Sequence, residues 1–336
     1  MSQHFLLSSS AKSLGIMDIM SLTEDEALGL MCQSRWPETG GEPICPQCGS
    51  EASWKIKVRR QWRCKSCNHT YSVTSGTVFD NCKLPLKLYL LAILIFSNAA
   101  KSLSALQLSR DLKVHYRTAY RLAQLLRESL LATRDESPMT GHVEVDGGYT
   151  GTYIRPANRK DDRVDRRSAE TPNKRCVLVM RQRGKHGADR TLTEIVKSES
   201  SDVVIDFVTG GTRAGTTVNA DENAAYDSLA AWYDINRVNH SIEYRGEDGS
   251  NINQAESYFS RFRRMQWGQM HRLDVKYLAL YANEIAWRED SRRMSNGKIF
   301  FEILGKAFRL ELPGTWRNYG YGRGLNSTTP ALAEVA

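Results

Sequence analysis

Two closely spaced pairs of cysteines constrain the N-terminal part of this chain more than any other feature of its sequence. The segment CPQCGSEASWKIKVRRQWRCKSC holds two CxxC pairs separated by 15 residues, namely Cys45, Cys48, Cys64 and Cys67. Each pair fits a tight turn that directs two thiolates to one point, and a hairpin between the turns brings the pairs together. The pattern predicts a zinc ribbon with one structural Zn²⁺, whose four protein ligands leave no position open for catalysis.

The alternatives for these cysteines are a redox CxxC motif or separate core residues, and two pairs at this spacing favour zinc over both. Metal-binding cysteines are typical of a reducing compartment, so we expect the chain in the cytoplasm. No apolar run reaches membrane-spanning length, and the N-terminus MSQHFLLSSSAKSLG lacks the apolar region of a secretory signal.

Charge is distributed unevenly along the chain, although its net value is +8. Residues 55–134 hold 15 Lys and Arg against 3 Asp and Glu, whereas residues 189–256 hold 5 against 13. The basic block suits a polyanion and the acidic block suits cations, although ordinary solvated surface would also explain each of them. In the basic block, Arg59 and Arg60 form a polar turn within the zinc hairpin and are expected to contact DNA.

The rest of the basic block reads as helices over roughly 86–97, 102–112 and 116–130. In the last helix, apolar residues fall on one face by helical spacing. The opposite face carries Arg117, Tyr120, Arg121 and Gln124. This is the pattern of a helix-turn-helix whose second helix enters a major groove of DNA, and the alternative is an ordinary helical packing unit with a basic surface.

A carboxylate inside an apolar strand marks the middle of the chain. In GHVEVDGGYTG (141–151), Val143 and Val145 alternate with other residues as in a β-strand. On that period Glu144 and Asp146 share one face. A buried carboxylate without a partner is costly, and a bound cation would supply the partner. The stretch therefore predicts that Asp146 holds a metal ion.

Two further acids can converge with Asp146 from distant positions. Asp221 ends a second apolar strand at roughly 216–220, and Glu256 lies in the first turn of a helix that begins near Gln254. Three such carboxylates suit Mg²⁺, and two ions can clamp the attacking and leaving oxygens of a phosphodiester. The structural alternative is that Asp221 caps the following helix and that Glu256 is favoured by the helix dipole.

Five stretches, in order along the chain, resemble the insertion-sequence transposases of the DDE type that bear an N-terminal zinc ribbon. They are RWPETGGEPICPQCGS, WRCKSCNHTYSVTSGTVF, VEVDGGYTG, VNADENAAY and NQAESYFSRFRR, within about Arg35 to Arg293. The resemblance implies a multidomain α/β protein with a ribonuclease H-like catalytic domain. It also implies that Asp146, Asp221 and Glu256 are the catalytic acids and ligate two Mg²⁺ or Mn²⁺ ions.

The chain departs from this family at two positions. Relatives often have a glutamate directly after the first acid, where this chain has Gly147, so we expect that role to be absent or taken by Glu144. They also commonly have a lysine seven positions after the third acid, and Arg263 keeps the charge there and adds bidentate contact to phosphate. We expect Arg263 and its neighbour Arg264 to contact DNA. Asn253 is the alternative oxygen ligand if the third acid points away.

The resemblance implies a DNA transposase that binds the terminal inverted repeats of its element, cleaves DNA strands and transfers them to target DNA. Two DNA ends must be paired, so a homodimer or higher oligomer is expected at the bacterial nucleoid. The alternatives are a DNA-binding regulator with an inactive nuclease-like domain and a ribonuclease H-like nuclease that cuts without joining.

We expect four segments along the chain. They are an N-terminal helix and zinc ribbon at 15–75, a helix-turn-helix domain at 83–135, a ribonuclease H-like domain at 140–312 and a disordered tail at 321–336.

Overall fold

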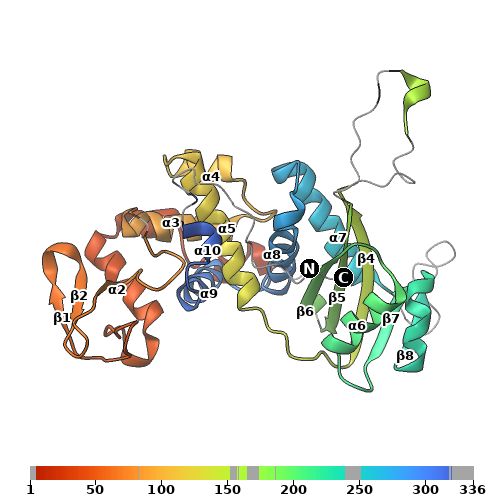
Figure 1. Cartoon of the computed structure of the whole chain (residues 1–336), viewed down its shortest axis with the longest axis horizontal. Coiled ribbons are helices and arrows are strands. Elements are labelled where there is room, and N and C mark those ends of the chain that lie inside the picture. Colours follow the sequence, from red (N-terminus) through yellow and green to blue (C-terminus); the bar gives the residue numbers. More distant parts are fainter. Residues whose placement is uncertain are drawn as a thin grey trace. The chain divides into compact units, whose positions relative to one another are not determined.

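The computed structural model describes residues 5–81, 83–151, 157, 159–164, 174–185, 187–238, 251–317 and 319. The chain divides into two compact units (Figure 1): Met1–Thr133 with Arg293–Ala336 form the first, and Arg134–Arg292 form the second. The tail expected at 321–336 lies outside the described residues. Among the helices that are described, none is long and apolar enough to cross a membrane.

The first unit is mainly helical and carries one small sheet. Its helices are α1 (Ile16–Ser21), α2 (Glu24–Arg35), α3 (Leu86–Asn98), α4 (Ala105–Asp111), α5 (Tyr116–Ala132), α9 (Asn296–Arg309) and α10 (Gly314–Arg317). Its strands are β1 (Ser53–Ile56), β2 (Gln61–Cys64) and β3 (Thr70–Ser72), which pair antiparallel in that order. Short 3₁₀ turns lie at Phe5–Leu7, Ser9–Ala11, Pro37–Thr39 and Lys57–Arg59.

Helix α3 forms the centre of this unit. Its sequence LKLYLLAILIFSN is apolar on almost all sides, which is typical of a helix enclosed by others, and residues 89–94 are all buried. Helices α1, α2, α5 and α9 contact it. The carboxylate of Glu24 accepts hydrogen bonds from the backbone N–H groups of Leu86, at 3.0 Å, and Lys87, at 3.3 Å, and so caps the start of α3.

Helix α9 belongs to the first unit, whereas we expected the catalytic domain to extend to residue 312. Phe300, Ile303 and Leu304 lie on its buried face, which packs against α2, α3 and α5. The helical spacing of these residues indicates that one face is buried. It does not indicate which unit buries that face, and this explains the different boundary.

The second unit is built on a five-stranded sheet of order β6–β5–β4–β7–β8. Its strands are β4 (His142–Thr150), β5 (Arg175–Gly184), β6 (Gly187–Val196), β7 (Thr217–Asp221) and β8 (Asp234–Val238). Strands β4, β5 and β6 are antiparallel neighbours, while β7 is parallel to β4 and to β8. The other elements are α6 (Ser201–Gly211), α7 (Asn253–Met265), α8 (Leu278–Asp290), the π-helical turn η7 (Gln266–Met270) and the 3₁₀ segments η5 (Lys160–Asp162), η6 (Ala224–Ala231) and η8 (Val275–Tyr277).

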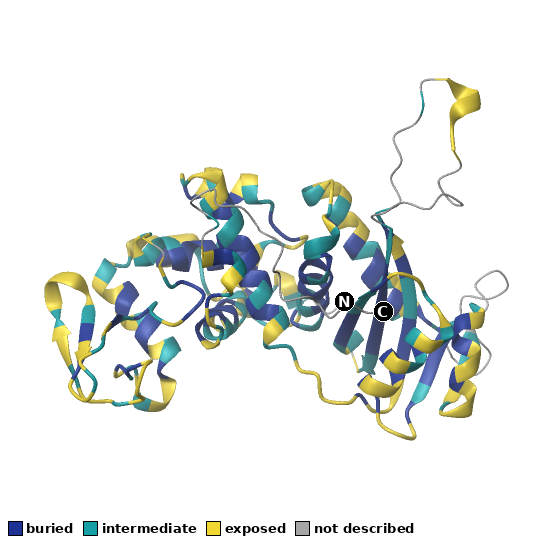
Figure 2. Ribbon diagram, in the orientation of Figure 1, coloured by how far each residue is buried: buried dark blue, intermediate teal, exposed yellow. Residues whose placement is uncertain are grey.

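Helices cover the sheet on both faces, so its central strands are buried (Figure 2). On one face, Leu178 and Met180 of β5 pack in a core with α6 and η6. On the other face, Val177 and Val179 pack in a core with α7 and α8. A strand buried on both faces needs a continuous apolar run, and the segment CVLVM of β5 supplies it.

Candidate functional site

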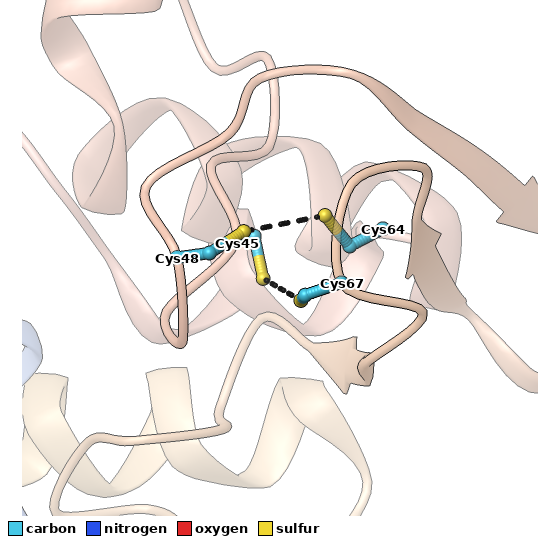
Figure 3. Close-up of side chains that lie close together, drawn as sticks. All are labelled: Cys45, Cys48, Cys64 and Cys67. Carbon is cyan, nitrogen blue, oxygen red and sulfur yellow. Dashed lines mark hydrogen bonds between the residues drawn. The ribbon is translucent and has the colours of Figure 1, made fainter.

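The four cysteines expected to bind zinc lie together in the first unit (Figure 3). The Sγ atoms of Cys45 and Cys67 are 3.7 Å apart, and those of Cys48 and Cys64 are 3.5 Å apart. All four sulfur atoms lie within 4.8 Å of one another. Four sulfurs at the usual Zn–S distance around a tetrahedral ion are about 3.8 Å apart, so the cluster fits one structural Zn²⁺.

The two CxxC turns share the same backbone geometry. The N–H of Gly49 donates to the carbonyl of Cys45 at 2.9 Å, and the N–H of Asn68 donates to the carbonyl of Cys64 at 3.1 Å. Gly49 and Asn68 both adopt left-handed φ angles, of 71° and 58°. Glycine and asparagine adopt this conformation most readily, so each turn has a suitable residue directly after its second cysteine.

Asp146 and Asp221 come from neighbouring parallel strands of the second unit. Val145 of β4 is paired in register with Ala220 of β7, so the next residue along each strand is one of these two acids. The apolar residues just before them face the core formed with α6. Because side chains alternate along a strand, both carboxylates project from the face that α7 covers.

Glu256 joins the two aspartates from the first turn of α7, where it is exposed. Burial raises the pKa of Asp146 to about 7, and repulsion from Asp221, Glu199 and Glu256 adds to the shift, against a hydrogen bond from the N–H of Gly147. The three expected acids therefore interact electrostatically. Their oxygen atoms do not form a group within 4.8 Å; in the part of the chain that the structure describes, only the four cysteines do.

Glu144 is fully buried and binds the N-terminus of α7. Its Oε2 accepts hydrogen bonds from the backbone N–H groups of Gln254, at 2.7 Å, and Ala255, at 3.2 Å. Its Oε1 pairs with the Nε of Arg183 at 2.6 Å. Burial raises the pKa of Glu144, and the guanidinium of Arg183 opposes that shift. Both oxygens are thus engaged away from Asp146, so Glu144 supports the helix that carries Glu256.

Asn253, the alternative ligand, is the exposed first residue of α7.

Asp221 is not the residue that caps the following helical segment η6. Asp221 accepts a hydrogen bond from the N–H of Asn223 at 2.9 Å, and it is Asn223 whose side chain caps η6 by accepting from the N–H of Ala225 at 3.0 Å.

Glu199 is a fourth acid whose charge acts on Asp146, and no local sequence pattern indicates it. It lies in the loop between β6 and α6, and burial raises its pKa, with a further contribution from Asp221. Its carboxylate lies against the Cα of Gly147. The sequence signal was indirect: Gly147 is a glycine inside a strand, which often marks a close approach of another group.

Four arginines outside α5 are expected to contact DNA, and all four are exposed. Arg59 and Arg60 are in the connection between β1 and β2, where Arg60 Nε pairs with Asp25 Oδ1 at 2.8 Å. Arg263 and Arg264 are exposed in the last turn of α7, the helix that carries Glu256.

The three helices expected in the basic block are present as α3, α4 and α5. The face of α5 expected to read DNA is covered in part, since Arg117 is exposed, Tyr120 and Arg121 are half-buried and Gln124 is buried. Gln124 has no exposed surface, and its Nε2 donates to the hydroxyl of Tyr120 at 3.1 Å. The ring of Tyr120 stacks on Tyr319, with centroids 5.8 Å apart. Arg117 and Arg121 line a cavity of about 370 Å³. The burial of Gln124, whose side chain bonds Tyr120 and Arg127 of its own helix, corrects the expectation that it contacts DNA.

Two known domain families match separate parts of this chain. Residues 22–70 match the transposase zinc-ribbon domain, and residues 138–290 match the ISXO2-like transposase domain. A Halobacterium salinarum protein described as an uncharacterized protein in transposable element ISH50 is 27% identical over 263 residues, covering 75% of this chain and 85% of that protein.

Among solved structures, the chain is similar to a crystal structure of a pre-cleavage Mos1 transpososome. The match covers 64% of this chain and 77% of that chain at 15% identity, with a TM-score of 0.19. That TM-score is too low to infer a shared fold.

Proposed function

The chain is a member of the insertion-sequence DDE transposases that bear an N-terminal zinc ribbon, and from this premise we propose that it cleaves and transfers DNA strands at the ends of its own element. The observation that carries the proposal is the placement of Asp146 and Asp221 at adjacent positions of β4 and β7, with Glu256 in the first turn of α7 close enough to contribute to the pKa of Asp146. Burial raises the pKa of Asp146 to about 7, and repulsion from neighbouring carboxylates adds to that shift, which is typical of an acid placed to bind a cation.

The topology of the second unit supports a ribonuclease H-like catalytic domain. Three antiparallel strands are followed by two parallel ones, with Asp146 on the central strand and Asp221 at the end of its parallel neighbour. Helices cover both faces, and Glu256 projects from one of them. The proposed site thus draws on three acids that are up to 110 positions apart in sequence and whose charges interact in the fold.

Asp146, Asp221 and Glu256 would hold two catalytic Mg²⁺ or Mn²⁺ ions, which would supply positive charge to stabilise the reacting phosphodiester. The donor set suits these ions because carboxylate oxygen is the ligand that they prefer. The chain's own contribution is to hold the acids: β4 and β7 fix the two aspartates, and Glu144 fixes α7 through its first N–H groups.

The zinc ribbon and the basic residues would bind the terminal inverted repeats of the element, and such binding would bring the protein to the bacterial nucleoid. Arg263 and Arg264 stand on the helix of the third acid, where they would contact the DNA being cut. Arg59, Arg60 and Arg117 are exposed in the first unit and suit phosphate contacts. Tyr120 and Arg121 are half-buried and would contribute less. Pairing two DNA ends would require at least a homodimer.

The test uses purified, zinc-loaded protein with Mg²⁺ and labelled DNA that carries the repeats flanking the coding sequence. Asp146→Ala and Asp221→Ala are compared with the unaltered protein. We expect nicking and joining that both substitutions abolish, with end binding retained. Binding without cutting by all three proteins would contradict the proposal and indicate a DNA-binding regulator. Cutting without joining would indicate a nuclease.

A further inference from the structure

A side chain on Gly147 would not fit while Glu199 keeps its position. A Cβ atom at this position would lie 2.4 Å from Oε1, 2.6 Å from Cδ and 2.8 Å from Oε2 of Glu199. The φ angle of Gly147 is not in the left-handed region, so the backbone conformation itself would accept any residue. The carboxylate of Glu199 therefore occupies the volume that a side chain next to Asp146 would fill.

The Glu199 carboxylate is held on both oxygens. Nδ2 of Asn223 donates to Oε2 at 3.0 Å, and the hydroxyl of Tyr226 donates a short hydrogen bond to Oε1. The backbone N–H of Glu199 donates to the hydroxyl of Tyr149 at 3.1 Å, which ties the loop to β4. These contacts fix where the carboxylate lies.

Asn223 connects Glu199 to the second acid. The backbone N–H of Asn223 donates to Oδ1 of Asp221 at 2.9 Å, while its side chain binds Glu199 and caps η6. Glu199 is thus joined to Asp221 through one residue, and it touches β4 at the residue directly after Asp146.

We propose that Glu199 is a positioning residue of the acidic site: its carboxylate, seated against Gly147, holds the turn after Asp221 so that the two aspartates keep the spacing that a divalent cation requires. This inference rests on the proposed function, since it assigns a role relative to the metal-binding acids. Glu199 does not itself contact substrate in this scheme, because both of its oxygens are bound by Asn223 and Tyr226.

The geometry indicates a variant that moves the carboxylate from the loop to the strand. The gap of 2.6 Å between a Cβ on Gly147 and Cδ of Glu199 matches the span from Cβ to Cδ within a glutamate, about 2.5 Å. A glutamate at position 147 can therefore place its own carboxylate where that of Glu199 lies, if residue 199 no longer has a side chain. The double variant is Gly147→Glu with Glu199→Gly.

The experiment measures Mn²⁺ binding by the full, zinc-loaded chain, with free Mn²⁺ followed by electron paramagnetic resonance. Glu199→Gln should weaken the tightest Mn²⁺ site about tenfold, as loss of a group that orients metal ligands commonly does. The double variant should restore affinity to within about threefold of the unaltered protein. Glu222→Gln is the matched control, because it removes an exposed charge next to Asp221 without touching Gly147, and it should leave the affinity unchanged.

Each other outcome overturns a defined part of the proposal. Equal affinity in Glu199→Gln and the unaltered protein would remove the role of Glu199 and leave the metal site intact. Failure of the double variant to restore affinity, while its circular dichroism and melting temperature are normal, would show that the loop and not the carboxylate position matters. If Glu199→Gln does not fold, Tyr226→Phe replaces it in the experiment and should weaken Mn²⁺ binding several-fold. Unchanged Mn²⁺ affinity in Tyr226→Phe would also refute the positioning role of Glu199. Absence of Mn²⁺ binding by the unaltered protein would instead refute the proposed function.

Discussion

The Oε2 atom of Glu144 lies 2.7 Å from the backbone nitrogen of Gln254, so a buried carboxylate of β4 caps the helix that carries the third acid. Asp146 follows Glu144 by two residues on the same strand, and Glu256 follows Gln254 by two residues on the helix. This one contact therefore fixes the position of the third acid relative to the first. Glu144, which supports α7, and Asp146, the proposed metal ligand, thus share one face of β4.

Glu144→Gln should destabilise the second unit. The substitution leaves the guanidinium of Arg183 without its counter-charge and weakens the cap on α7, and because Arg183 remains partly exposed we expect a loss of about 2–3 kcal/mol in the free energy of unfolding. Urea denaturation followed by circular dichroism measures it. Glu222→Gln, at an exposed site, should change stability by less than about 0.5 kcal/mol. Equal effects of the two substitutions would show that Glu144 is not a structural cap.

Asp146→Asn should make the Mg²⁺-free protein more stable at alkaline pH. The pKa of Asp146 is raised from 3.8 to about 7, so the folded state binds a proton that the unfolded state releases, and stability falls as pH rises from about 4 through about 7. Asparagine does not titrate, so the variant does not lose stability over this pH range. We expect a gain on the order of 2 kcal/mol at pH 8 and little difference at pH 4, with Mg²⁺ narrowing the gap at pH 8. Melting curves at both pH values test this, and a gain of the same size at both would contradict it.

Removal of zinc should unfold the small β1–β2–β3 sheet. Its core includes Trp62, whose ring lies 5.7 Å from that of Trp36 and 6.0 Å from that of Tyr71. A chelator, or Cys64→Ala, should release one zinc per chain and shift the tryptophan emission to longer wavelength, because folding of such a site depends on the metal. Cys32→Ala should keep the zinc, since Cys32 lies buried in α2 outside the cluster. Full zinc content in Cys64→Ala would refute the four-cysteine site.

Gly148→Ala should destabilise the protein, whereas Gly210→Ala should not. A Cβ on Gly148 would lie 2.3 Å from a ring carbon of Phe259 in α7, while a Cβ on Gly210 in α6 would meet nothing within 4 Å. Overpacking of this kind costs about 1–3 kcal/mol, and alanine for glycine in a helix gains up to about 1 kcal/mol. Comparison of the two melting temperatures tests the prediction. A stable Gly148→Ala protein would mean that α7 can move away from the sheet.

Local patterns predicted the elements and residues whose signal lies within a few positions. The CxxC spacing predicted the cysteine cluster, and apolar alternation placed Asp146 on a strand with Asp221 at the end of another. Each of these rests on periodicity or on ligand spacing, which neighbouring residues largely determine.

Contacts between distant segments could not be predicted in the same way. Helical spacing predicted an apolar face of α5 but not the burial of Gln124, nor the stacking of Tyr120 on Tyr319, almost 200 positions later in the chain. Glu199 was one of 13 acids in residues 189–256, and nothing near it in sequence distinguished it from the others. Only the approach of its loop to Gly147 gives it a role.

Because α9 belongs to the first unit, a truncation of the gene at its 3′ end would affect the two units of the protein differently. Asp146, Asp221 and Glu256 all lie within Arg134–Arg292, whereas the first unit includes α9, which comes after that segment. A genomic copy that acquires a stop codon just after position 292 would thus encode all three acids and lose the helix that packs on α2, α3 and α5. The first unit of the encoded protein should then be unstable. Codons for all three acids in a truncated element therefore do not indicate that the element can still transpose.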